Sequence, residues 1–257
     1  MLHMINNNNG LPFMLQRLTS FVLLLLLPFF AHAGDSAENI QAIRYLAFSA
    51  GSHVLLHFNT NQGGADLRYA DRYHHDLEQL RLRLASGSDQ ALQVIGERLF
   101  AQVAELEKHP AGDAQLYPLW INPVLETQAA LDRLAEMRYT QVLHSVEPRP
   151  TIDRLSLDVQ RILLYYQTSS FGALAIYLDD FKDGSPLTLD QSILNGFSEL
   201  ARTQPQLTDE LTKLRRKYEF VRPNVLRKDL PAVPGGAAFY LSQVGDGLNE
   251  LAAHTAP

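Results

Sequence analysis

Residues 155–181 contain no proline and carry apolar side chains at helical spacing. One row recurs at intervals of three, four and seven, which places it along one side of a helix: Leu155, Val159, Ile162, Tyr166, Ala173 and Tyr177. A second row widens this stripe: Leu163, Phe171, Leu174, Leu178 and Phe181. The helix would be about 40 Å long at 1.5 Å per residue. A stripe this wide needs more than one neighbour, so the pattern predicts the central helix of a bundle.

The rest of the chain shows similar helical segments separated by turn-forming residues. Asp35, Asp66, Ser88 and Thr151 are predicted to cap helices, and Thr188 with Gln191 forms a capping box. Besides the central helix, the predicted helices cover residues 36–58, 66–86, 88–108, 123–145, 188–203, 205–221 and 237–252. No segment has a convincing strand pattern. The sequence therefore predicts an all-α protein of eight helices.

The helices are predicted to form two tandem halves that resemble four-helix bundles, at residues 34–147 and 148–257. The boundary is the stiff segment Glu147-Pro148-Arg149-Pro150. The halves also align with each other, because Arg44 matches Arg161 and Gly64 matches Gly184 at nearly the same offset. This alignment indicates an internal duplication. The alternative is chance similarity between helical patterns.

The N-terminal residues 1–33 are predicted to be a signal peptide. Arg17 precedes the apolar run FVLLLLLPFF at residues 21–30, and Ala31-His32-Ala33 fits a cleavage site. A start at Met14 would give a more ordinary leader. The run is short for a membrane span, which takes about 20 residues, although an uncleaved anchor is the alternative. No second apolar run of that length follows, so we expect a soluble periplasmic or secreted protein, not an integral membrane protein after cleavage.

Composition narrows the function further. The chain has no cysteine, which excludes disulfides, thiolate metal sites and cysteine nucleophiles. The net charge is −6, and it becomes −7 without the leader, which holds Arg17 and no acidic residue. This acidic balance argues against nucleic-acid binding.

Arg44, Arg161 and Tyr165 are the candidate ligand-binding residues. If the duplication is real, the two arginines occupy equivalent points on two helices. Two guanidinium groups can hold a small anion or carboxylate in bidentate fashion. Tyr165 belongs to the aromatic central helix, and its alternative role is that of a core aromatic residue with a polar tip. The alternative is that both arginines extend to solvent beside the apolar stripe.

The resemblance of these helices to a known group supports a binding role. Arg44 with Leu46, and Arg161 with Leu163, match the start of an R-x-L-S-Q-R-like motif on the first helix of a helical domain, although its Ser-Gln and second Arg are absent here. The layout is similar to the periplasmic sensor domains of type IV pilus methyl-accepting chemotaxis proteins and nitrate/nitrite sensor kinases. The resemblance implies a ligand-binding module.

Lys213, Arg215, Arg216 and Lys217 are the candidate partner-docking residues. They form a basic run on an acidic protein and could meet an acidic partner or anionic lipid head groups. The alternative is a solvated face that pairs with Glu210 and Glu219.

The remaining patterns do not indicate a metal, a cofactor or catalysis. His53 and His57 have a spacing that can serve one metal ion, but a third ligand is lacking. Residues 179–190 resemble a calcium loop only in part, because Phe181 and Leu187 stand where oxygen ligands are needed. No serine elbow, phosphate loop, dinucleotide motif or zinc-protease motif is present in the sequence. We therefore expect a non-enzymatic binding module for a small anion or organic acid, or else an accessory envelope protein that docks onto a protein partner.

Overall fold

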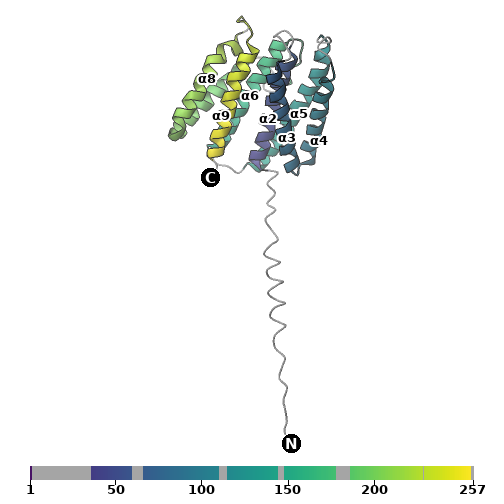
Figure 1. Ribbon diagram of the computed structural model, residues 1–257. Coiled ribbons are helices and arrows are strands. Elements are labelled where there is room, and N and C mark those ends of the chain that lie inside the picture. The colour runs from purple at the N-terminus through teal and green to yellow at the C-terminus, as the bar shows by residue number, and fades with distance from the viewer. Residues whose placement is uncertain are drawn as a thin grey trace. The chain divides into compact units, whose positions relative to one another are not determined.

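The computed structural model describes Met1 and residues 36–59, 66–109, 115–143, 148–177, 186–227 and 229–255. Across these residues the secondary structure is helical, with no strand, which confirms the predicted all-α class (Figure 1). Gly34–Pro257 forms one compact unit. Its helices are α2 (Ala37–Phe58), α3 (Leu67–Ser86), α4 (Gln90–Leu106), α5 (Tyr117–Val142), α6 (Arg149–Phe171), α7 (Leu187–Thr203), η5 (Pro205–Leu207), α8 (Thr208–Leu226) and α9 (Pro234–His254).

Several predictions concern segments outside the described residues. They are the signal peptide with its cleavage site at Ala33, the calcium-like residues 179–185, and the turn glycines Gly64 and Gly184. These remain predictions.

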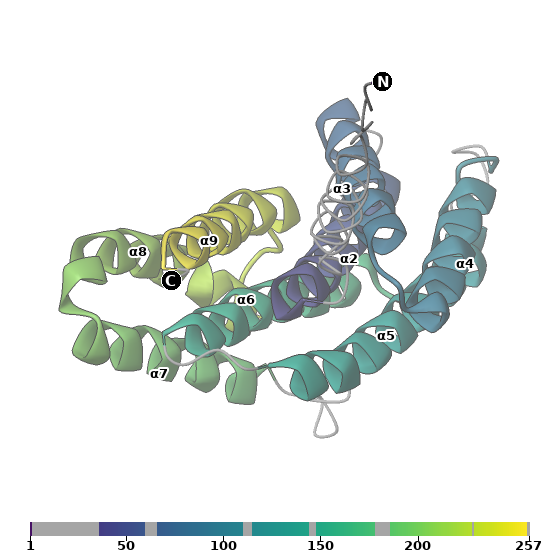
Figure 2. The same cartoon turned by 90° about the horizontal axis from the view of Figure 1, so that it is seen from below.

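The helices form two neighbouring groups, α2–α5 and α6–α9 (Figure 2). Each group packs around a hydrophobic cluster. The first lies among α2, α3, α4 and α5 and includes Phe48, Tyr73, Leu80, Leu106 and Ile121. The second lies among α6, α7, α8 and α9 and includes Ile152, Val159, Phe197, Tyr218 and Leu241. The clusters exchange side chains, because Leu157 and Leu164 of α6 join the first and Leu56 of α2 joins the second. The internal duplication itself remains a prediction.

Short polar side chains fix three of the helix starts. The side chain of Ser36 accepts a hydrogen bond from Asn39 N at α2, and the side chain of Asp66 accepts one from Arg68 N at α3. At α4 the cap is Asp89, which accepts from the backbone of Ala91 and Leu92. The prediction of Ser88 was therefore one residue too early. A carboxylate at this position also suits the positive end of the helix dipole.

The central helix α6 begins and ends earlier than predicted. It starts at Arg149 without a side-chain cap, so the assignment of Thr151 as its cap was wrong. Pro150 lies in the first turn, where a missing N–H costs little. The helix stops at Phe171, ten residues short of Phe181, because Gly172 has φ 77°. Glycine adopts this left-handed conformation readily and commonly follows the last residue of a helix.

Proline also lies inside helices where the sequence suggested boundaries. The structure extends α5 back to Tyr117, so Pro123 is internal, and extends α8 through Pro223 to Leu226. The N-cap residue of α7 is Pro186, and no side chain caps this helix. The predicted Thr188–Gln191 capping box was therefore wrong. Buried faces on these helices outweigh the local preference of the prolines.

Gly245 allows α9 to approach α2 and α6 closely. A Cβ atom at this position would lie 2.6 Å from Gln160 Nε2 and 2.8 Å from Tyr45 Oη. Gly51, also inside a helix, has its nearest neighbour at 3.6 Å, Leu164 Cδ1, which is an ordinary contact distance. The two glycines therefore differ in packing but share a helical setting.

We predict that Gly245→Ala lowers the free energy of unfolding by about 1–3 kcal/mol, the usual cost of overpacking. The matched control Gly51→Ala is expected to leave stability unchanged or to raise it, because alanine favours a helix over glycine. Urea denaturation followed by circular dichroism measures both. Equal effects of the two substitutions would contradict close packing at Gly245.

Candidate functional site

The structure brings Arg44 and Arg161 together, on a carboxylate of the chain itself. Arg44 Nε donates to Asp132 Oδ1 at 2.6 Å, and Arg161 Nη2 donates to Asp132 Oδ2 at 3.1 Å. The three residues come from α2, α6 and α5, so one buried acid joins helices of both halves. Arg161 also lies over the ring of Phe48, at 5.8 Å from its centroid.

Two further carboxylates surround the arginine pair. Glu136 Oε1 lies 3.3 Å from Arg44 Nη2 and 3.9 Å from Arg161 Nη2, and Asp158 Oδ1 lies 3.7 Å from Arg161 Nη1. Two guanidinium groups thus face three carboxylates. A hollow of about 440 Å³ is lined by both arginines and Glu136. Its charge is already balanced by the chain, so the arginines do not provide an excess of positive charge for a free anion.

Tyr165 does not complete this group. It is buried, and it lines a different hollow of about 420 Å³ together with Tyr166 and Arg227. Position 165 follows position 161 by one helical turn, but the two side chains contribute to different cavities. The three predicted ligand-binding residues therefore do not line a single cavity.

We predict that Asp132→Asn lowers the free energy of unfolding by about 3 kcal/mol or more, because it removes the charge that compensates two buried guanidinium groups. Glu136 is 53% exposed at its side chain, so Glu136→Gln should cost less than about 1 kcal/mol. Chemical denaturation at neutral pH compares the variants. Equal losses would show that Asp132 is not the main counterion.

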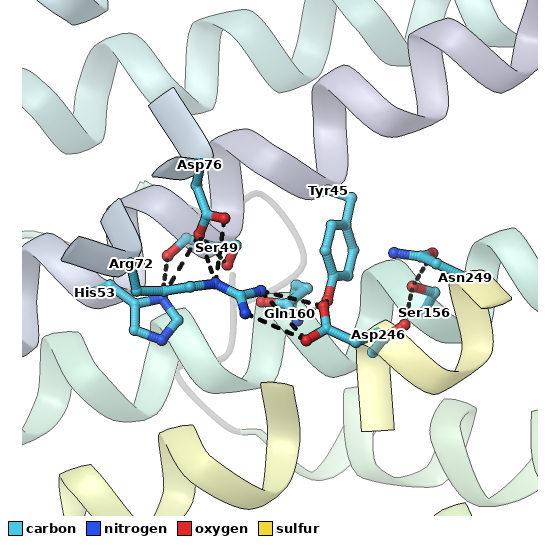
Figure 3. A network of polar contacts seen from close by, with 10 residues as sticks. Tyr45, Ser49, His53, Arg72, Asp76, Ser156, Gln160, Asp246 and Asn249 are labelled. Atoms are coloured by element: carbon cyan, nitrogen blue, oxygen red, sulfur yellow. Dashed lines mark hydrogen bonds and ion pairs between the residues drawn. The ribbon is translucent and has the colours of Figure 1, made fainter. Parts of the chain in front are cut away.

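A second polar network ties α2, α3, α6 and α9 together (Figure 3). Tyr45 Oη donates to Asp246 Oδ1 at 2.6 Å and accepts from Gln160 Nε2 at 3.1 Å. Arg72 bridges two acids: its Nε donates to Asp76 at 3.2 Å and its Nη2 to Asp246 at 3.1 Å. The network contacts both halves and fixes how α9 lies against α2 and α3.

His53 lies at one end of this network, and its geometry defines its tautomer. Its Nδ1 is 2.8 Å from the carbonyl oxygen of Ser49 and 3.9 Å from Asp76 Oδ2. Because a carbonyl can only accept, Nδ1 carries the proton in the neutral ring, and Nε2 is an acceptor. Burial lowers the pKa of His53 below its ordinary value of 6.5, which keeps the ring neutral at pH 7.

The neutral histidine makes stability depend on pH in a defined direction. Between the lowered folded-state pKa of His53 and the unfolded value of 6.5, the unfolded chain binds a proton that the folded chain does not. Stability from this group is therefore present above pH 6.5 and is lost as the pH falls. Asp76 changes stability in the opposite direction at lower pH. Burial raises its pKa above 3.8, so the folded chain takes up this proton before the unfolded chain does, and this contribution to stability grows as the pH falls. Arg72 and Asp246 are the other charged groups near His53.

We predict that His53→Gln flattens the fall in unfolding free energy between about pH 7 and pH 5.5, the range in which histidine titrates. The exposed His75 on α3 provides the control substitution His75→Gln. Urea denaturation across that range measures both slopes. A slope unchanged by His53→Gln would mean that its folded-state pKa is not lowered.

The predicted docking residues on α8 divide between two faces. Lys213, Arg216 and Lys217 lie at helical spacing on one side, and Lys217 Nζ donates to Gln243 Oε1 of α9 at 2.7 Å. Arg215 faces elsewhere: it pairs with Glu219 at 2.8 Å and its Nη1 reaches Ser198 Oγ of α7 at 3.5 Å. Only three of the four basic residues therefore share a surface.

Three aromatic residues that the sequence analysis missed adjoin this basic face. Phe220 of α8 is 67% exposed and Phe239 of α9 is 61% exposed. Tyr240 lies between them, with its ring centroid 4.8 Å from that of Phe220 and 5.2 Å from that of Phe239. The sequence could have revealed Phe220, because it lies seven residues after Lys213 and so falls on the polar side of the same helix. We call this surface the α8–α9 face: Lys213, Arg216, Lys217, Phe220, Phe239 and Tyr240.

The described residues contain no candidate metal site and no candidate membrane span. No cluster of three or more histidine, aspartate or glutamate side chains in these residues could hold a metal ion. None of the described helices combines the length and apolar character needed to cross a bilayer. Comparisons with protein-family models, curated proteins and solved structures found no match to this chain.

Proposed function

We propose that this protein is an exported accessory module that docks onto an acidic partner protein through the α8–α9 face. The observation that carries the proposal is the pair of exposed rings, Phe220 and Phe239, beside three basic side chains on an acidic chain. Aromatic and arginine residues are enriched at protein interfaces and supply most of their hot spots. Export rests on the leader-like sequence at residues 1–33.

Charge on the face favours a partner with discrete carboxylates. Arg216 is exposed, and a guanidinium group binds a carboxylate in bidentate geometry. Glu210 lies 3.8 Å from Lys213, and Glu219 pairs with Arg215, so acids border the basic residues. These acids weaken a diffuse attraction to anionic lipid, whereas a protein surface can place its carboxylates between them. We therefore assign an acidic protein surface, not a bilayer, as the partner.

The alternative role, binding of a small anion by Arg44 and Arg161, has less support. A hollow lies beside the two arginines, but Asp132, Glu136 and Asp158 already balance their charge. Arg44 Nη2 has no hydrogen-bond partner among the described residues, but an anion placed there would lie beside three carboxylates and be repelled by them. The docking role meets no such repulsion, and it requires no catalytic group.

The test is photo-cross-linking in cells, with a photoreactive amino acid at position 220. Position 94 provides the control, because Val94 of α4 is 62% exposed but lies on the other half. We expect one acidic protein to cross-link from position 220 and not from position 94. Purified partner should then bind the wild-type protein more weakly as salt rises, because the contact includes exposed charge pairs.

Matched variants separate specific docking from general charge effects. We predict that Arg216→Glu or Phe220→Ser weakens partner binding at least about tenfold, or about 1.4 kcal/mol, a loss that only a minority of interface residues produce. Arg98→Glu makes the same charge reversal on α4, and Val94→Ser replaces an exposed apolar side chain there with the same polar one. Both should leave binding unchanged. Flotation with phosphatidylglycerol vesicles or formation of a dimer through position 220, without an acidic partner, would refute the proposal.

A further inference from the structure

A hollow of about 570 Å³ lies between α9 and the pair α2–α3, apart from the arginine pair. Residues along one side of α9 line it, from Gly235 in the first turn to Asp246 three turns later. His53 comes from α2, and Arg68, Tyr69 and Arg72 come from α3. The docking role does not use this hollow, although Phe239 lies at the edge of both.

His53 offers the hollow an acceptor on a buried ring. The side chain is only 6% exposed, and its Nδ1–H is held by Ser49 O. No described residue bonds to Nε2, and Figure 3 shows this nitrogen directed away from Asp76 and Ser49. Because Nδ1 is fixed as the donor, Nε2 can accept an O–H or N–H from a ligand in the hollow.

Hydrogen-bond donors lie at the end of the hollow near the start of α9. The first turn of a helix has N–H groups without helical partners and carries partial positive charge. Gly235 lies in this turn, and a Cβ there would be 2.4 Å from Tyr69 Oη, so glycine permits the hydroxyl to approach the backbone. The Arg68 side chain is 84% exposed and pairs with Asp66 at the surface through Nε and Nη2. Among the described residues no acceptor takes its Nη1, so this nitrogen can donate to a ligand.

An apolar wall lies between these polar ends. It is formed by Ala238 and Phe239 of α9 and by the ring of Tyr69, whose centroid is 6.4 Å from that of His53. Arg72 does not provide a free donor, because Asp76 and Asp246 hold its guanidinium group. The hollow therefore combines the unpartnered acceptor of His53, a donor-rich end and an apolar surface. Ser242, Gln243 and Asp246 of α9 complete its polar lining, with Asp246 held by Arg72 and Tyr45.

We infer that this hollow binds a small 2-hydroxy acid with an apolar side chain. Its carboxylate would lie at Arg68 and the first turn of α9, its hydroxyl would donate to His53 Nε2, and its apolar group would pack against Tyr69 and Phe239. This role is separate from docking and does not depend on it.

Three matched probes test each part of the inference by calorimetric titration of the full chain: mandelate, phenylacetate without the hydroxyl, and mandelamide without the charge. We expect mandelate to bind about tenfold more tightly than either analogue, the factor that one well-placed hydrogen bond provides. Equal affinities for mandelate and phenylacetate, or no mandelate binding, would overturn the inference.

Two variants assign the preferences to residues. In His53→Phe the acceptor is lost, so mandelate should bind no better than phenylacetate. In Arg68→Gln, at a side chain that contributes little to the core, the preference for mandelate over mandelamide should fall. If His53→Phe does not fold, the ¹⁵N resonance of His53 Nε2 in the wild-type protein provides the test, because it should shift with mandelate and not with phenylacetate.

A control variant keeps this result independent of the docking proposal. Arg216→Glu alters the α8–α9 face but not the hollow, so it should leave mandelate binding unchanged. A mandelate preference that survives both His53→Phe and Arg68→Gln would place the ligand elsewhere and contradict the inference.

Discussion

The structure depends on how α2 and α6 bury charge where the two halves meet. Arg44 of α2 and Arg161 of α6 both donate to Asp132 of α5, and all three side chains are largely removed from water. An unpaired charge at this depth would be very costly, whereas a paired one with good geometry is tolerated. The helices can therefore pack only in a register that keeps the three side chains in contact.

The need to keep buried polar groups paired also explains the polar networks that lie between the two hydrophobic clusters. Apolar packing in each cluster supplies most of the stabilisation but tolerates small shifts of one helix along another. Hydrogen bonds are directional, and the contacts of Asp246 with Tyr45 and Arg72 hold α9 at one position against α2 and α3. We regard the networks as determinants of register, which is the best-supported role for buried polar groups.

The interior and the surface use basic residues differently. Inside, arginines are neutralised by the chain's own carboxylates, as Arg44 is by Asp132. On the α8–α9 face, Arg216 and the rings of Phe220 and Phe239 are exposed to solvent. Exposed aromatic surface on an otherwise charged protein often marks an interaction site. For this reason the surface of α8 and α9, not the buried arginine pair, carries the functional proposal.

The sequence by itself determined the fold class and the approximate positions of most helices, because the apolar period is a local property of the chain. It also located Arg44 and Arg161 as a pair. It could not identify their partner, because Asp132 lies on another helix far away in the sequence. It placed the end of α6 ten residues late, since the positive φ of Gly172 has no signature beyond glycine itself. The neighbouring positions of Phe220 and Tyr240, and the hollow beside His53, were decided by the packing of α8, α9, α2 and α3, which only the tertiary structure specifies.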